Sequence, residues 1–577
     1  MSQEFRFARK CFIGLGVLTV LVVVLISAAQ AFQIDTQNPD LRISWDNTIK
    51  YSAAFRVEGR SAKLTEASEN QSNRNQDDGD RNFDRGLVSN RIDLFSEFDA
   101  IYKNFGVRLS GAAWWDLVYN QRNDNDSPST ANSFSVNHDE FTDKTRTLHG
   151  RDAELLDAFV FGSVDAGSTT TSFRIGQYAM QWGESLFFGN NGIAGGMSPV
   201  DIVKLLSVPN SQFKEIIRPV PQVSAQLQTG PRVSLGAYYQ FKWEKTRLPG
   251  AGSYFSTSDV LDEGGERMLL GDPLPGGTEP IAWFRGDDQE ADDLGQWGAQ
   301  LRIRPGMGLD LGFYAIHYHD KTPQLYGLPG VDPVTGMVVN PSVVDFARGK
   351  IGEYILVYPQ DIQMYGISAS RTFGNWNLSA EVSMRDNTPL VSTLQTSIPA
   401  APPFFPGVNP DADNDKNPAY AVGRSVHANF SWLASFGPSF ISKEASFLGE
   451  VAWNERIEIT DNEEALDPNT DKDAWGFRMV YEPTYRQVLP GLDLSVPVGF
   501  SYFPKGKSSV VSNFGPDKGG DMNIGLKASY LDVWRFSLNY THFYGSEAGY
   551  LDEATHQNMK QSLADRDYVS FSIYRTF

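Results

Sequence analysis

Long stretches of this sequence alternate between apolar and polar residues with a period of two. Residues 43–57 carry aromatic and branched side chains on one face and polar or charged side chains on the other. Such a period puts successive side chains on opposite faces of a β-strand. The pattern returns at 107–119, 297–303, 475–481, 494–502, 522–530 and 534–540. Strands this long and numerous do not suit an ordinary sandwich.

The connections between these stretches alternate in length. Short ones hold turn residues, at 103–106, 165–168, 229–231, 305–308, 373–375, 436–438 and 531–533, and long polar ones lie at 58–85, 121–150, 246–292, 321–352 and 387–423. Short periplasmic turns and long external loops are typical of outer-membrane barrels. We therefore predict an all-β, transmembrane antiparallel β-barrel of about 18 strands, or 16 as the alternative even number. A secreted β-helix or sandwich would need a repeat that is not seen.

The first 31 residues have the form of a secretory signal peptide. Arg6, Arg9 and Lys10 precede an apolar run at 11–28, and small residues follow at 29–31. We expect cleavage before residue 32, which leaves 32–577 as the barrel, and an uncleaved membrane anchor is the alternative. The single cysteine lies inside the signal, so the mature chain has no disulfide or cysteine-bound metal. A formal net charge of −20 argues against a nucleic-acid partner.

The sequence ends in an alternating stretch, residues 569–577. A closed barrel needs its last strand to pair with its first, so we expect this stretch to pair with residues 43–57. A terminal aromatic strand also resembles the signal by which the barrel-assembly machinery recognises its substrates. Arg575 departs from that signal, because an apolar residue usually stands there.

Several motifs together resemble one known family. They are RDAELLDAFV at 151–160, FRIGQYAMQWGES at 173–185, NNGI at 190–193, SPVD at 198–201, LPGLDL at 489–494 and DRDY at 565–568. The chain resembles, over nearly its whole mature length, the Gram-negative family known as domain of unknown function thirteen-oh-two. The resemblance implies an outer-membrane barrel similar to long-chain fatty-acid channels, and it carries over no catalytic residue.

Residues 182–219 follow a strand but are too irregular to form one. Ser198 and Pro199 have the form of a helix start, with Ser198 as the cap, and Ile202, Leu205 and Leu206 then make one apolar face. A barrel of this width would otherwise be a water-filled pore. We therefore expect this partly helical segment to fold into the lumen as a plug or constriction. An external loop with a short surface helix is the alternative.

The residues expected to contact a substrate or to narrow the lumen lie on this segment and beside it. They are Arg174, Trp182, Glu184, Leu186, Phe187, Phe188, Ile202, Leu205 and Arg218. Pockets for greasy ligands are mostly apolar with a few placed polar groups, which this set provides. The two charged residues of the segment itself, Glu184 and Arg218, would pair with opposite charges on the wall.

Metal and catalytic patterns are weak in this sequence. His317 and His319 share a strand face, which we assign to the lumen side with Phe313, and no third ligand accompanies them. The acidic stretches 73–80 and 411–415 could hold calcium but do not fit an EF-hand, so we expect solvated loops. No histidine accompanies a G-x-S-x-G motif. The sequence predicts no enzyme, cofactor or metal.

A transport function remains. The sequence predicts an outer-membrane channel or transporter for hydrophobic or amphipathic small molecules such as lipids, fatty acids or aromatic compounds. The alternative is a non-catalytic partner of a periplasmic lipid-binding protein or an inner-membrane efflux pump. We expect the protein to lie in the Gram-negative outer membrane. Its expected partners are the lipid and lipopolysaccharide of that membrane and the barrel-assembly machinery.

Overall fold

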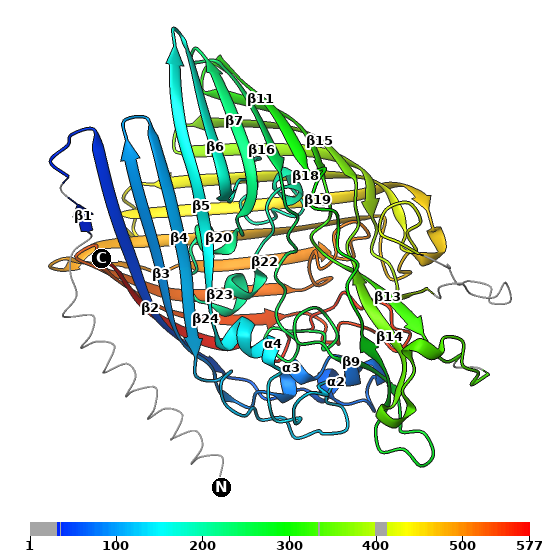
Figure 1. The fold of residues 1–577 in the computed structure, drawn as a ribbon. Coiled ribbons are helices and arrows are strands. Elements are labelled where there is room, and N and C mark those ends of the chain that lie inside the picture. The colour runs from blue at the N-terminus through cyan, green and yellow to red at the C-terminus, as the bar shows by residue number, and fades with distance from the viewer. Residues whose placement is uncertain (1–31, 35, 333–334, 398–411) are drawn as a thin grey trace.

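The alternating stretches form the wall of a closed barrel. The computed structural model describes residues 32–34, 36–332, 335–397 and 412–577. Within these residues, 18 antiparallel strands make the wall (Figure 1). The expected strand number is therefore confirmed, whereas the predicted signal peptide, 1–31, lies outside the described residues.

One strand of the wall is broken in two. Pro497 separates its halves, since proline has no N–H to give to a neighbouring strand, and both halves pair with β20 and β23. The wall strands are β2 (Leu41–Arg56), β3 (Gly86–Tyr102), β4 (Phe105–Asp116), β5 (Arg151–Ala166), β6 (Thr169–Tyr178), β7 (Val220–Thr229), β8 (Val233–Gln240), β11 (Trp297–Gly306), β12 (Leu309–Tyr318), β15 (Ile362–Phe373), β16 (Trp376–Pro389), β18 (Val422–Phe436), β19 (Glu444–Asp461), β20 (Asp473–Leu489), β21 with β22 (Leu492–Ser495, Val498–Lys505), β23 (Gly520–Tyr530), β24 (Trp534–Tyr544) and β25 (Tyr568–Thr576).

The first and last wall strands close the barrel. β25 pairs antiparallel with β2, from Thr48 opposite Thr576 to Arg56 opposite Tyr568. A short strand, β1 (Phe32–Ile34), pairs with β2 further along the same edge. The expected closure is confirmed, and it leaves no long unpaired edge in the wall.

The two faces of the wall differ as the alternation predicts. Trp45, Trp115, Trp297 and Trp475 are exposed on the outer face, as an apolar, lipid-facing surface with aromatic girdles requires. Charged side chains of the opposite phase form pairs in the interior, for example Arg108 with Asp99, Arg478 with Asp521 and Lys527 with Glu482.

Strand β12 corrects the predicted position of His317, whereas His319 follows the end of this strand and is buried. His317 lies directly opposite Trp297 of β11, so it shares the outer face, and their rings stack with centroids 6.3 Å apart. The side chains of Tyr314 and Ile316 are buried on the inner face instead. Apolar residues fill inner positions here because, as described below, they pack against a segment inside the barrel. The assumption that apolar residues face lipid therefore failed on this strand.

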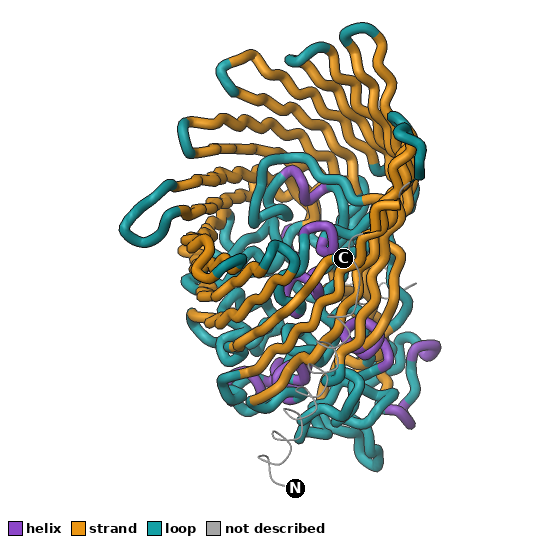
Figure 2. The backbone as a smooth tube through the Cα atoms, turned by 90° about the vertical axis from the view of Figure 1, so that its left-hand side faces the viewer, coloured by secondary structure: helices purple, strands orange, loops and turns teal. Residues whose placement is uncertain are grey.

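Short turns lie at one end of the barrel and long loops at the other, which we call the loop end (Figure 2). The loops form a second, five-stranded sheet in the order β17-β13-β14-β10-β9. Its strands are β9 (Arg267–Gly271), β10 (Ile281–Arg285), β13 (Gln324–Pro329), β14 (Lys350–Val357) and β17 (Gln395–Thr396). The loop helices are α2 (Ala62–Thr65), η1 (Gln71–Asn75), α3 (Asp78–Arg81), α4 (Asp143–Thr145), η2 (Arg146–Gly150), η4 (Pro341–Val343), η5 (Phe346–Arg348) and η6 (Glu463–Ala465). None of the helices in the described residues is long and apolar enough to cross a membrane.

Candidate functional site: a segment across the barrel interior

The connection between β6 and β7, residues 179–219, lies inside the ring of strands (Figure 2). It contains η3 (Ile193–Gly196), α5 (Ile202–Ser207) and α6 (Phe213–Ile216). It hydrogen-bonds to β16, β18 and β19, and further along to β24 and β25. These two groups of strands and β6 itself are well separated around the wall. The connection, which we call the inner segment, therefore crosses the interior.

A buried glutamate of β19 holds the first turn of the inner segment. Glu450 Oε2 accepts the backbone N–H groups of Leu186, Phe187 and Phe188 at 3.0, 2.5 and 3.0 Å. Its other oxygen accepts the Asn429 side-chain amide at 2.6 Å. A carboxylate enclosed by backbone N–H groups has its charge stabilised by their dipoles. Glu450 thus fixes the turn against the wall.

A second buried glutamate acts in the same way from β16. Glu381 accepts the N–H groups of Glu184 and Ile193 at 2.5 and 2.9 Å. Four residues further along the same face of β16, Arg385 donates to the carbonyl of Asn190 at 2.7 Å. The wall therefore supplies both acceptors and donors to the inner segment, which satisfies backbone groups that no regular structure pairs.

Asn191 links the inner segment to two strands. Its side chain bonds Asn429 at 2.8 Å and Asn454 at 3.0 Å, and its oxygen lies 3.2 Å from His427 Nδ1. His427 Nε2 in turn lies 2.8 Å from Ser425 Oγ. The order serine, histidine, amide is that of an activated nucleophile. Ser425 is fully buried, however, so this chain of bonds anchors the segment and offers no access to a substrate.

Ion pairs hold α5 to the wall. Lys204 lies 2.7 Å from Glu154 of β5, and Arg247 of the β8–β9 loop pairs with the same carboxylate at 2.7 Å. The residue that caps α5 differs from the prediction. Asp201 caps the helix by accepting the N–H of Lys204, whereas Ser198 donates to the backbone carbonyl of Met180. The wrong cap was chosen because Asp201 follows the proline and Ser198 precedes it.

The far end of the inner segment reaches the strands that close the barrel. The Asn210 side chain donates to Ser572 of β25 at 2.9 Å and to Ser537 of β24, and Lys214 pairs with Glu97 of β3. A narrow cleft here is lined by Thr48, Lys50, Asp93, Phe95, Asn210, Gln212, Glu215 and Tyr574. Polar and charged groups of both the wall and the segment thus meet beside the closure.

The inner segment also exposes apolar side chains. Leu186, Phe187, Leu205, Leu206 and Phe213 are exposed, and Phe213 is 66% accessible. Because the segment lies within the wall, these side chains border the interior and not the lipid. Apolar groups beside a few placed charges are the composition of a site for a greasy or amphipathic molecule.

Other apolar residues of the predicted set pack against the wall. Trp182 contacts the rings of Tyr238 and Tyr314, with centroids 5.0 and 6.2 Å apart. Phe188 packs against Phe503 and Phe514 near the loop end. These two aromatic residues therefore hold the segment in place, and Ile202 is half-buried at the start of α5.

The three charged residues of the predicted set contact different parts of the structure. Glu184 pairs with Arg302 of β11 at 3.0 Å. Arg218 instead contacts the β8–β9 loop, where it donates to the carbonyl of Lys245 at 3.1 Å and forms an ion pair with Glu244 at 4.0 Å. Arg174 lies on β6 over two aromatic rings, away from the inner segment's ion pairs.

The sequence prediction missed the anchoring residues Glu381, Glu450 and Asn191. Each glutamate lies between small or apolar inner-phase neighbours on a long strand, in the stretches SAEVS and LGEVA. A lone acid at an inner position could have indicated a bond to something inside the barrel. Its partner could not be identified from local sequence patterns, because it lies almost 200 residues or more away along the chain.

Comparisons with known proteins give a family and several distant structures. The family model described as "Protein of unknown function (DUF1302)" matches residues 13–577. No curated protein matches the sequence. Among solved structures, Acinetobacter baumannii OccAB3 is 9% identical with a TM-score of 0.40, covering 93% of this chain and 99% of that one. Pseudomonas aeruginosa OccD3 (OpdP) is 10% identical with a TM-score of 0.39, covering 95% and 93%.

The outer membrane channel DcaP of Acinetobacter baumannii is 9% identical with a TM-score of 0.35, covering 95% of this chain and 100% of that chain. These scores are low. The fold assigned to this chain therefore rests on the pairing of its own strands.

Proposed function

This chain belongs to the DUF1302 family, and we propose that it is an outer-membrane channel for hydrophobic or amphipathic small molecules, with residues 182–219 as its constriction. The observation that carries the proposal is the row of exposed apolar side chains on a segment inside a charged wall. An apolar ligand can rest on Leu205 and Phe213 while its polar end meets wall charges.

The location follows from the same features. An exposed apolar outer face on a closed barrel is suited to a bilayer, and a barrel leaves no backbone group unpaired in lipid. The loop end would face outward and the short turns the periplasm. Outer-membrane fractionation with heat-modifiable migration tests this location, and recovery as a soluble periplasmic protein would contradict it.

Conductance in planar bilayers tests the channel. Excising residues 189–212 should raise single-channel conductance several-fold, because the wall strands keep their mutual hydrogen bonds while the interior is cleared. The control shortens the exposed β9–β10 hairpin, residues 272–280, which lies outside the wall. Equal conductance in the excised and intact proteins, both shown to be folded, would contradict the constriction.

Uptake measurements test the substrate class. Replacing Leu205 and Phe213 by serine should slow entry of fatty acids of increasing chain length and leave ion conductance nearly unchanged. Phe440 is 99% exposed and lies in a short turn, so Phe440→Ser is the matched control. Fatty-acid uptake that is unchanged by both inner substitutions would contradict the proposal that the substrates are apolar.

A second candidate is a barrel that does not conduct and docks a periplasmic lipid carrier or an inner-membrane pump. This candidate is favoured by the many hydrogen bonds and ion pairs between the inner segment and separate sides of the wall, because they hold the segment across the interior. A sealed protein that nevertheless binds a periplasmic partner would favour this candidate.

A further inference from the structure

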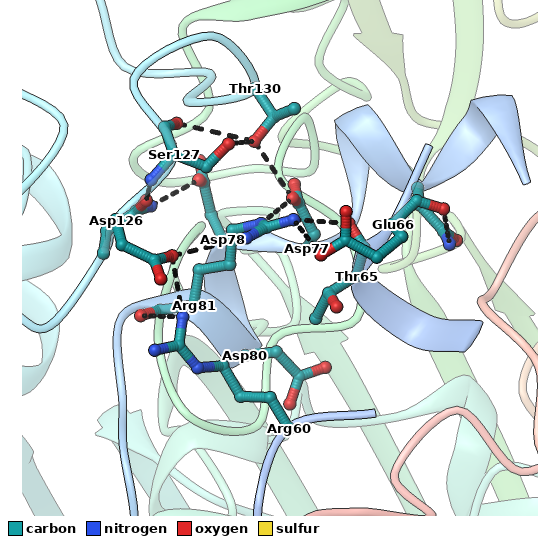
Figure 3. Close-up of polar contacts among 12 residues, drawn as sticks. Arg60, Thr65, Glu66, Asp77, Asp78, Asp80, Arg81, Asp126, Ser127 and Thr130 are labelled. Atoms are coloured by element: carbon teal, nitrogen blue, oxygen red, sulfur yellow. Dashed lines mark hydrogen bonds and ion pairs between the residues drawn. The ribbon is translucent and has the colours of Figure 1, made fainter. Parts of the chain in front are cut away.

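Three acidic side chains from two distant loops meet at the loop end. Asp77 and Asp78 begin α3 in the β2–β3 loop, and Asp259 lies in the β8–β9 loop. One carboxylate oxygen from each lies within 4.8 Å of the other two, and all three residues are buried. Figure 3 shows Asp77 and Asp78 beside Arg81 and Thr130.

Two oxygens of this group lack any partner. Asp77 Oδ2 accepts from Arg81 and Thr130, and Asp259 Oδ2 accepts the Asp78 N–H at 3.1 Å. Asp77 Oδ1 and Asp259 Oδ1 are buried, and no donor among the described residues reaches them. Each Asp78 oxygen takes one hydrogen bond, from Asn125 and from the Asn132 N–H, and keeps a free lone pair.

The charge of the group is not balanced. Within the described part of the chain, Arg81 alone forms an ion pair with any of the three acids. Two negative charges then remain in a buried place, where isolated charge is costly. The group therefore favours capture of protons or of a divalent cation.

A fourth oxygen comes from another loop. Asn132, in the β4–β5 loop, is buried, and its Oδ1 has no partner among the described residues. Its Nδ2 donates to Asn75 and to the Arg267 carbonyl, which fixes the amide orientation. Asn132, Asp78 and Asp259 line one small cavity. An unpartnered amide oxygen at that cavity provides a second indication of a bound cation, independent of the acids.

We infer that Asp77, Asp78, Asp259 and the amide oxygen of Asn132 bind one calcium ion at the loop end. Carboxylate and amide oxygens are the ligands that calcium takes, and a separation of up to 4.8 Å fits two calcium–oxygen bonds of about 2.4 Å each. A buried site suits calcium better than magnesium, which keeps several of its waters. The two positive charges balance the two unpaired negative ones.

The ion would connect three loops. Asp77 and Asp78 belong to the first long loop, Asn132 to the second, and Asp259 to the fourth. Bound calcium thus holds these loops together over the mouth of the barrel, whether or not the barrel conducts. Removal of the ion leaves like charges in contact and loosens the same loops.

Calorimetric titration of the purified full-length protein, after treatment with a chelator, tests the site. Calcium chloride should give a saturable signal with a Kd of about 0.1–1 mM, the range of extracellular calcium modules, and magnesium chloride should bind more weakly because magnesium keeps several of its waters. Asp259→Asn is the sharpest variant, because the amide oxygen can still accept the Asp78 N–H while –NH2 replaces the unpartnered oxygen. This variant should lose calcium affinity by about tenfold or more.

Limited proteolysis of the loops provides a second measurement. Calcium should slow cleavage of the wild-type loops and have no effect on Asp259→Asn, whereas in chelator the variant should be cleaved more slowly than wild type because one repulsive charge is gone. Asp143→Asn, an exposed loop acid, is the control and should behave as wild type. Heat-modifiable migration shows that each variant is folded. A wild-type protein without a calcium signal, or a folded Asp259→Asn variant with wild-type affinity, overturns the inference.

Discussion

Asn47 and Phe577 exchange both of their backbone hydrogen bonds, 2.7 Å from Asn47 N to Phe577 O and 2.9 Å from Phe577 N to Asn47 O. Beside them, the hydroxyls of Thr48 and Thr576 lie 2.8 Å apart. The first and last strands of the wall are therefore joined through Phe577.

Truncation from Tyr568 should prevent assembly, because β25 has no substitute between β24 and β2. Deleting Phe577 alone removes two hydrogen bonds, which lowers the free energy of unfolding by about 2 kcal/mol. The deletion should therefore lower the temperature at which the folded gel band is converted to the unfolded band. Phe577→Ala keeps both backbone bonds and is the control for the aromatic side chain. Normal membrane levels of the long truncation would contradict the role of β25.

Glu450→Ala should release the first turn of the inner segment. Three backbone N–H groups lose their acceptor, at roughly 1 kcal/mol each. We expect frequent current fluctuations between two or more conductance levels in planar bilayers. Glu482→Ala removes an inner carboxylate that pairs with Lys527 on the wall, and it should leave the current steady. A steady current from folded Glu450→Ala would show that this anchor is dispensable.

Glu154→Gln should loosen α5, because Lys204 is nearly buried and would lose its ion pair. Breaking a buried pair from one side costs about 3–5 kcal/mol. Hydrogen exchange of residues 201–207 should therefore quicken. Adding Lys204→Met removes the stranded charge and should restore much of the protection. If the double variant exchanges as fast as Glu154→Gln, a stranded lysine is not the cause.

His149 should make the loop end sensitive to acid. Burial, and the nearby positive charges of Arg91 and Arg247, lower its pKa to about 3, and its Nε2 accepts the Gly250 N–H at 3.1 Å. The unfolded loop takes up a proton near pH 6.5 and the folded loop does not, so stability is fully present above pH 6.5 and is lost as the pH falls. The loss is about 2 kcal/mol between pH 6.5 and 5.

Proteolysis of the loops at graded pH measures this effect. His149→Gln can still accept a hydrogen bond and does not titrate, so it should abolish most of the pH dependence. His556→Gln changes a partly exposed loop histidine and serves as the control. Equal acid sensitivity in wild type and His149→Gln would assign the effect to another group.

The arrangement of the barrel wall can be read from the sequence alone. A two-residue period has one structural meaning, and connections of alternating length order the strands without knowledge of any contact. Closure of β25 on β2 followed because a barrel cannot leave an edge unpaired. The strand number, the outer tryptophans and the short turns were predictable for the same reason: each depends on neighbours in the chain or on the next strand.

What fills the interior and what joins the loops depends on contacts between segments that are far apart in the sequence. Glu450 and the turn at 186–188 are far apart in sequence, and no local pattern pairs them. His317 was placed on the wrong face because Tyr314 and Ile316 pack against an inner segment instead of lipid. Asp259 meets Asp77 and Asp78 across about 180 residues. Periodicity records which side chains share a face of a strand, whereas the partners of that face depend on how distant segments pack together.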